Sequence, residues 1–588
     1  MSFSNYPVIT LSFACTVSVL LASCGSVEKS EEELAEINIS PVIEVSNLPQ
    51  KTEIEKKQKI IPQTAAESRR INQQGLAKAR GDHGQMYKAE PASIAARSIS
   101  ADYAYSDSYM YQPEENRENY QHFKDNSIFK TTEIPVSTFS VDVDTGSYSN
   151  VRRFLNQGQL PQKDAVRAEE LINYFSYSYA YPENKQQPFS INTEIAPSPW
   201  NKNSYLLHVG LQAYQSHAQE RPASNLVFLV DVSGSMQSRD KLQLLKSGLK
   251  LLVNQLNEND RISIVSYAGS TGVVLKPTKG DQTESINMAL DRLMAGGSTN
   301  GSSGIKLAYQ MAKQSFIKNG VNRIVLATDG DFNVGVTNFE SLKQMVEEKR
   351  KTGVSLTTLG FGRGNYNDHL MEQLADVGNG NYSYIDNMNE ARKVLVEEMN
   401  STLNTVASDV KIQLEFNPEQ VAEYRLIGYE NRALNREDFN NDKVDAGEIG
   451  ENHTVTALYE VTFTDSVVKH LDNMRYARAT VSGKSSSYNN EVAFLRLRYK
   501  ADNKSASQLI EKPLLKSDVL KSLDVASKDF KFSAAVAAFA QQLRGGKYLQ
   551  KFDYDDILSL ARKAKGEDLS GYRAEFIQLV SLAKSLDV

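Results

Sequence analysis

Three oxygen-bearing side chains stand at alternate positions in the stretch Asp231-Val-Ser233-Gly-Ser235. They follow a continuous apolar run from Leu226 to Val230, which is typical of a strand buried on both faces of a parallel sheet. In open α/β sheets, ligands bind at the carboxyl ends of the strands. A carboxylate and two hydroxyls suit a hard cation such as Mg²⁺, Mn²⁺ or Ca²⁺. The stretch therefore predicts a divalent-cation site, with Mg²⁺ the expected ion.

The same residues allow two other interpretations. Ser and Asp at a strand-to-helix turn often cap the first turn of a helix. A serine could also be a nucleophile, but no Gly-x-Ser-x-Gly sequence is present and no histidine lies near Ser233 or Ser235 in the sequence. The chain also lacks the His-Glu-x-x-His sequence of zinc hydrolases. We find no catalytic constellation and do not expect an enzyme.

The elements that must position these residues alternate between strands and helices. This alternation predicts an α/β fold with a doubly wound parallel sheet over residues 221–407. Within it, Thr299 lies in a glycine-rich loop that leads into a helix, and Asp329 ends a second apolar strand. The main predicted strands are 225–231, 261–267, 323–329 and 355–362, and the main predicted helices are 241–256, 305–316 and 339–351.

The order Asp231, Ser233, Ser235, Thr299 and Asp329 resembles the metal-ion-dependent adhesion site of the von Willebrand factor type A domain. The resemblance implies that Ser233 and Ser235 coordinate the ion through their hydroxyls. It implies that Asp231, Thr299 and Asp329 coordinate directly or through water. It also implies one coordination position left for an Asp or Glu of a protein partner. Three neutral hydroxyls and two carboxylates leave a divalent cation electrophilic enough to recruit that carboxylate.

Strands with alternating apolar and polar residues flank the α/β block on both sides. Two precede it, at 189–196 and 205–214, and four follow it, at 409–416, 421–429, 453–463 and 491–499. Such alternation is typical of antiparallel strands with one buried face. We expect the two groups to pair, so that the α/β domain is an insertion in, or is flanked by, an antiparallel β-sandwich. Residues 408–505 form the second β region, and 506–588 are predicted to be helical.

Two further groups of acidic residues suggest chemistry. Asp144-Thr-Gly-Ser147 matches the aspartic-protease sequence, but that reaction needs two carboxylates sharing a proton, and the chain has no second copy. A hydrolase would therefore require a homodimer or an unrecognised site. Asp438, Asn440 and Asp442 are spaced like calcium ligands, although Lys443 replaces the usual glycine. The alternative is a solvated acidic loop.

The N-terminus is predicted to be a lipoprotein signal peptide, residues 1–23. Its apolar segment ends in Leu-Ala-Ser-Cys24, which resembles the bacterial lipobox and implies lipidation of Cys24. Two or more acyl chains would give stable membrane anchoring. Gly25, rather than Asp, implies the outer membrane, facing the periplasm or the cell surface. Residues 24–131 lack any sustained period and predict a disordered tether, followed by a region of helices and strands at 132–220.

The charge composition argues against one class of protein, the nucleic-acid-binding proteins. The net charge of −6 over 588 residues does not favour nucleic-acid binding. From residue 137 onward, the order of segments resembles the uncharacterised bacterial lipoproteins in which a von Willebrand type A domain lies between two family-specific regions. The resemblance implies a lipid-anchored envelope protein that binds a protein partner. The alternatives are an envelope hydrolase and a structural envelope protein in which the metal only stabilises the fold.

Overall fold

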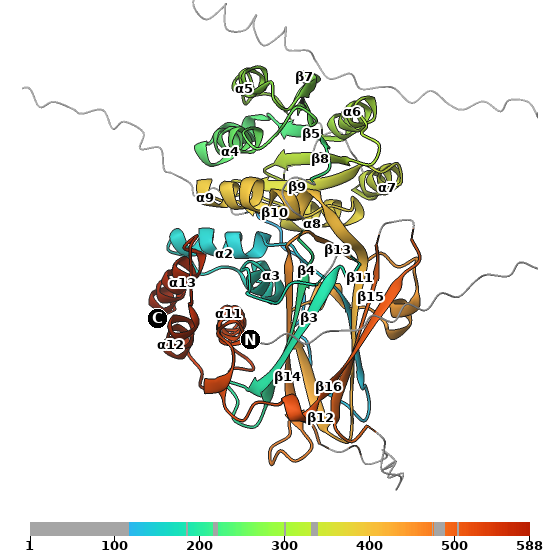
Figure 1. Ribbon diagram of the computed structural model, residues 1–588. Coiled ribbons are helices and arrows are strands. Elements are labelled where there is room, and N and C mark those ends of the chain that lie inside the picture. The colour runs from blue at the N-terminus through green and yellow to red at the C-terminus, as the bar shows by residue number, and fades with distance from the viewer. Residues whose placement is uncertain are drawn as a thin grey trace, which may run out of the picture. The chain divides into compact units, whose positions relative to one another are not determined.

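A β-sandwich, an α/β domain and a layer of helices make up the described part of the chain (Figure 1). The computed structural model describes residues 117–183, 186–215, 221–298, 301–330, 339–472, 474, 488–501 and 505–587. Among these residues, no helix is both long and apolar enough to cross a membrane.

The sandwich consists of two antiparallel five-stranded sheets. Apolar side chains from both sheets, including Leu207 and Leu211 and, opposite them, Leu414 and Leu495, form one buried core. The first sheet has the order β1 (Phe129–Lys130), β12 (Val421–Ile427), β14 (Thr454–Phe463), β4 (Tyr205–Ala213), β3 (Phe189–Pro197). The second has the order β13 (Gly447–Gly450), β11 (Thr405–Phe416), β15 (Glu491–Lys500), β16 (Gln508–Leu515), with β2 (Val136–Ser140) also paired to β11.

The pairing of strands confirms that the α/β domain is inserted into the sandwich. Strand β4, which precedes the insertion, pairs with β14, which follows it, from Tyr205↔Val461 to Gln212↔Thr454. Strand β2 likewise pairs with β11. The alternating pattern predicted this arrangement because each strand presents an apolar face that the opposite sheet can cover.

The inserted domain has a six-stranded sheet in which β7 alone is antiparallel. Three residues connect β6 to β7, too few for the crossover that a parallel pair requires. The strand order is β10 (Tyr382–Ile385), β9 (Ser355–Phe361), β8 (Val321–Thr328), β5 (Ser224–Asp231), β6 (Arg261–Tyr267), β7 (Thr271–Lys279). All eight residues of β5 are buried, as the apolar run predicted.

Helices cover both faces of this sheet (Figure 1). One face packs against α4 (Leu244–Val253), α5 (Thr283–Asp291), α9 (Met388–Arg392) and α10 (Met399–Leu403). The other packs against α6 (Gly301–Gln314), α7 (Phe339–Arg350) and α8 (Asp368–Val377). The chain leaves the domain through α10 and enters β11 two residues later.

A helical layer covers the outer face of the first sandwich sheet. It contains α2 (Gly146–Asn156), α3 (Ala168–Asn173), α11 (Lys528–Leu543), α12 (Tyr554–Ala564) and α13 (Tyr572–Leu586). Helix α11 is buried around most of its circumference, which explains its alanine-rich sequence, because small side chains allow neighbouring elements to approach on every side. Leu206 and Leu458 of the sheet belong to the same core.

Two predicted boundaries are wrong. The predicted tether extends to residue 131, but residues 117–131 contact the folded body: Glu118 forms an ion pair with Arg153, and β1 pairs with β12. These residues lack a periodic pattern because their partners are scattered over other elements. The predicted helical region begins at 506, whereas β16 extends the second sheet to Leu515 and the first long helix begins at Lys528.

Candidate metal centre

Asp231 is the last residue of β5, at the carboxyl edge of the parallel sheet. Its side chain is fully buried. Oδ1 accepts a hydrogen bond of 2.9 Å from the backbone N–H of Ser233. Oδ2 accepts hydrogen bonds from the hydroxyls of Thr328, at 2.8 Å, and Tyr267, at 3.3 Å. The carboxylate is therefore held in one orientation at the base of the predicted site.

The two predicted serine ligands lie together above it. The Oγ atoms of Ser233 and Ser235 are 3.0 Å apart. Ser233 is buried, whereas Ser235 is exposed, so the site opens to solvent on the Ser235 side. A turn of 3-10 helix that begins at Gly234 places the two hydroxyls on one side of the chain.

The glycine-rich loop approaches the same edge. The N–H of Gly296 donates to the carbonyl of Val232 at 2.7 Å, and the N–H of Gly234 donates to the carbonyl of Gly297 at 3.0 Å. These two bonds join the loop to the Asp231–Ser235 turn. Thr299, the predicted ligand in this loop, lies outside the described residues.

Asp329 follows β8, the strand beside β5, and is fully buried. The ammonium of Lys241 donates to its Oδ2 at 2.9 Å, and Lys241 is itself buried. The amide of Asn365 lies 3.5 Å from the same oxygen. Four of the five predicted ligands, Asp231, Ser233, Ser235 and Asp329, thus lie at one edge of the sheet, with a lysine among them.

Lys241 is a feature that the sequence interpretation missed. A regular helix was predicted from Lys241, but the helix is regular only from Leu244, and Lys241 has a non-helical backbone (φ −118°, ψ −107°). Gly362, at φ +74°, makes room for its side chain, since a Cβ there would overlap Cε of Lys241. A cation at a helix N-terminus is unfavourable because the helix dipole is positive there. The lysine at the start of the predicted helix therefore indicated that Lys241 has another role.

The electrostatics of the edge suit a cation. Burial raises the pKa of the Asp231 carboxyl to about 6, and hydrogen bonds from Ser233 oppose the shift. Two buried carboxylates at one place require compensating positive charge. Among the described residues, Lys241 supplies one such charge. The remaining donors are hydroxyl oxygens, which are ligands for Mg²⁺ or Ca²⁺ rather than for softer metals.

A second acidic cluster already contains a cation from the chain. Asp142, Asp144 and Glu372 are buried with carboxylate oxygens within 4.8 Å of one another. The Arg432 guanidinium contacts all three, at 2.9 Å from Asp142, 3.2 Å from Asp144 and 3.4 Å from Glu372. Burial nevertheless raises the pKa of the Glu372 carboxyl to about 8. The cluster joins the α/β domain, the helical layer and the sandwich.

This environment bears on the hydrolase alternative. Asp144 is 5% exposed, and one of its oxygens accepts the backbone N–H of Tyr382 at 2.8 Å. A second chain cannot place its own Asp144 beside this one without opening the junction between the domains.

The predicted calcium loop divides its side chains among different partners. Asp438 accepts from Asn435 in a capping box. Asn440 accepts from Arg498 at 2.8 Å, and the carbonyl of Asp442 accepts from Lys500 at 2.9 Å. The side chains of Asp438 and Asn440 thus have separate partners, and the contact of Asp442 is made by its backbone carbonyl. Cys24, the predicted lipidation site, lies outside the described residues.

Three known families match parts of the chain. The von Willebrand factor type A domain family matches residues 225–398. A family described as von Willebrand factor matches residues 114–208, and one described as uncharacterized protein YfbK, C-terminal, matches residues 401–586.

Three similar proteins illustrate the extent of the resemblance. Uncharacterized protein YfbK of Escherichia coli (strain K12) is 50% identical over 470 residues, which cover 79% of this chain and 80% of that protein. Uncharacterized protein sll0103 of Synechocystis is 29% identical over 214 residues, which cover 36% of this chain and 50% of that protein. The solved structure of von Willebrand factor type A from Catenulispora acidiphila is 14% identical with a TM-score of 0.38, and covers 68% of this chain and 91% of that chain.

Proposed function

Since the chain belongs to the family of uncharacterized protein YfbK and contains a von Willebrand factor type A domain, we propose that it binds a protein partner through a divalent-cation site. The observation that carries the proposal is the meeting of Asp231, Ser233, Ser235 and Asp329 at one sheet edge. In the proposal, Thr299 completes the set of ligands.

Each described residue has a distinct part in this function. Ser233 and Ser235 provide the hydroxyl ligands, and Asp231 and Asp329 provide the negative charge. Thr328 and Tyr267 orient Asp231 through hydrogen bonds to its Oδ2. A bound cation would supply a positive centre for an Asp or Glu of the partner. The exposed side of Ser235 is where that carboxylate would arrive.

The site can be tested by partner capture. Tagged full-length protein is incubated with envelope extract in Mg²⁺ or in EDTA, and the retained proteins are identified. We expect a partner that is retained in Mg²⁺, is lost in EDTA and is lost with Ser233→Ala. Ser238→Ala is the matched control, because Ser238 is exposed and its hydroxyl donates to Asp240, outside the proposed ligand set. Equal capture of the same partner by Ser233→Ala or in EDTA would contradict the proposal.

The proposed location is the outer membrane, through lipid on Cys24. The sequence before Cys24 supports the lipid anchor, and Gly25 supports the outer membrane. The test of the anchor is independent of the metal site. We expect radiolabelled palmitate to be incorporated into the wild-type protein and not into Cys24→Ser, which should also leave the membrane fraction. Cys15→Ser is the control, since Cys15 is the only other cysteine in the chain. Membrane retention of unlabelled Cys24→Ser would exclude this anchor.

A further inference from the structure

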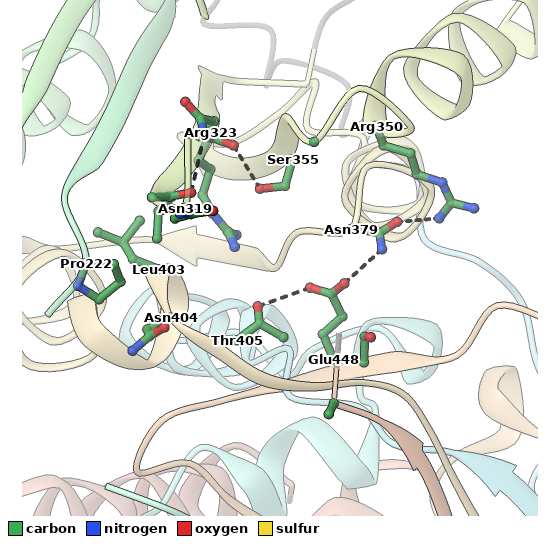
Figure 2. A pocket seen from close by; sticks show the side chains of 16 residues that line it. Pro222, Asn319, Arg323, Arg350, Ser355, Asn379, Leu403, Asn404, Thr405 and Glu448 are labelled. Carbon is green, nitrogen blue, oxygen red and sulfur yellow. Dashed lines mark hydrogen bonds between the residues drawn. The ribbon is translucent and has the colours of Figure 1, made fainter. Parts of the chain in front are cut away.

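A cavity of about 470 Å³ lies at the end of the α/β sheet opposite Asp231 and Asp329. It is bounded by the first residues of β8 and β9 on one side and by the start of β11 and by β13 on the other (Figure 2). Pro222 and Leu403, which line it, lie on the two connections between the α/β domain and the sandwich. Its size is within the range of small-molecule sites.

Arg323, in β8, carries a buried positive charge on the wall of this cavity. The residue is 2% exposed. Its Nη1 donates to Thr357 at 2.6 Å, but its Nε has no hydrogen-bond partner. Among the described residues, no carboxylate oxygen lies within 4.0 Å of the guanidinium, and Glu448 acts on it only from farther away.

The burial of Arg323 makes this charge unfavourable. Burial lowers the pKa of the guanidinium, although the group stays charged at neutral pH. A buried guanidinium without a close counter-ion loses its hydration and gains no ion pair in return. An anion in the cavity would supply that ion pair.

The opposite wall offers hydrogen-bond acceptors. Figure 2 shows a chain of hydrogen bonds that runs from Arg350 and Asn379, in the α/β domain, to Glu448 and Thr405 on this wall. Glu448 accepts from Asn379 at 2.8 Å and from Thr405 at 3.3 Å. A carboxyl on this wall would repel a second negative charge on a ligand, but it can accept a hydroxyl or ammonium hydrogen.

We propose that this cavity binds a small organic carboxylate that also carries a hydroxyl or amino group. The ligand's carboxylate faces Arg323, and its donor group faces Glu448. A single negative charge on the ligand matches the single guanidinium that lacks a close counter-ion. A phosphate dianion carries one more negative charge than Arg323 can neutralise, and Glu448 would repel that second charge. The inference does not depend on the proposed metal site, because the two lie at opposite ends of the sheet.

Saturation-transfer NMR on the full-length protein tests the proposal, with L-serine, acetate and inorganic phosphate as probes. L-serine and acetate are observed directly, and phosphate is added as a competitor. We expect saturable binding of L-serine, weaker binding of acetate and still weaker competition by phosphate. Arg323→Gln should weaken L-serine binding at least about tenfold, as loss of a charge-assisted hydrogen bond predicts. Arg496→Gln, at a partly exposed position of β15, should bind like the wild type.

A second variant keeps the test valid if Arg323→Gln does not fold. Glu448→Gln retains Arg323, so acetate should still bind, but the advantage of L-serine over acetate should shrink. The proposal is overturned if the folded wild type binds none of the probes saturably, or if folded Arg323→Gln binds L-serine like the wild type. Tighter binding of phosphate than of either carboxylate would also overturn the assigned ligand class.

Discussion

Nζ of Lys241 lies 2.9 Å from Oδ2 of Asp329, so a cation of the chain itself contacts a proposed metal ligand. Both residues are buried. A divalent cation that uses Asp329 must therefore either displace this ammonium or bind beside it, and both reduce its affinity.

Replacing Lys241 should strengthen metal binding. We expect Lys241→Met to bind Mg²⁺ about tenfold more tightly, because a positive charge near the ion is removed. Isothermal titration measures the affinity. Lys250→Met is the control, since Lys250 is 38% exposed and pairs with Asp291 on the surface. Unchanged or weaker affinity in Lys241→Met would show that the ammonium does not compete with the cation.

Removing a hydroxyl ligand should abolish the stabilisation by metal. A ligand at about 100 times its Kd stabilises the native state by about 2.7 kcal/mol. We expect Mg²⁺ to raise the melting temperature of the wild type and not that of Ser233→Ala, while both melt alike in EDTA. Scanning calorimetry gives both values. A Mg²⁺-dependent shift of equal size in Ser233→Ala would exclude Ser233 as a ligand.

Arg432 should be important for stability. Arg432→Leu leaves Asp142 and Asp144 buried without a counter-ion, whereas Glu372 keeps Arg167 at 3.6 Å. Breaking a buried ion pair in this way costs about 3–5 kcal/mol. Urea denaturation measures the free energy of unfolding. Arg496→Leu, at a partly exposed ion pair, should cost less than about 1 kcal/mol. Equal losses in both variants would mean that the buried cluster is not held by Arg432.

His208 should make stability depend on pH. Burial lowers its pKa from 6.5 to about 4, and its Nε2 is 2.9 Å from the hydroxyl of Tyr179. Between these two pKa values the unfolded chain binds the proton and the folded chain does not, so the contribution of His208 is lost as pH falls below 6.5. The stability difference between wild type and His208→Gln should therefore shrink by about 2 kcal/mol from about pH 7 to about pH 5. Tyr179→Phe, which removes the hydrogen bond but leaves the buried histidine, should keep most of this pH dependence.

Local patterns predicted much of the fold and part of the site. The apolar run before Asp231 predicted the buried strand, and Asp-x-Ser-x-Ser predicted which of the proposed ligands lie at its end, because both signals lie within one short stretch of sequence. The insertion in the sandwich was also predictable, since alternating strands on both sides of the α/β block needed partners.

Contacts between distant residues were not predictable from one sequence. Lys241 and Asp329 are 88 residues apart, and Arg432 and Asp142 are 290 apart. No period or motif connects such pairs, and only the packed domains bring them together. The cavity beside Arg323 has the same origin, because its walls come from the α/β sheet and from the sandwich.

The insertion also sets an order of assembly. Strand β2 ends at Ser140, but its partner β11 begins only at Thr405. The α/β domain, in contrast, takes all six of its strands from one continuous segment, Ser224 to Ile385. Closing a long loop costs more entropy than closing a short one. The domain that holds Asp231 and Asp329 can therefore fold during synthesis, while β1 and β2, made before it, have no partner strand until β12 and β11 are made.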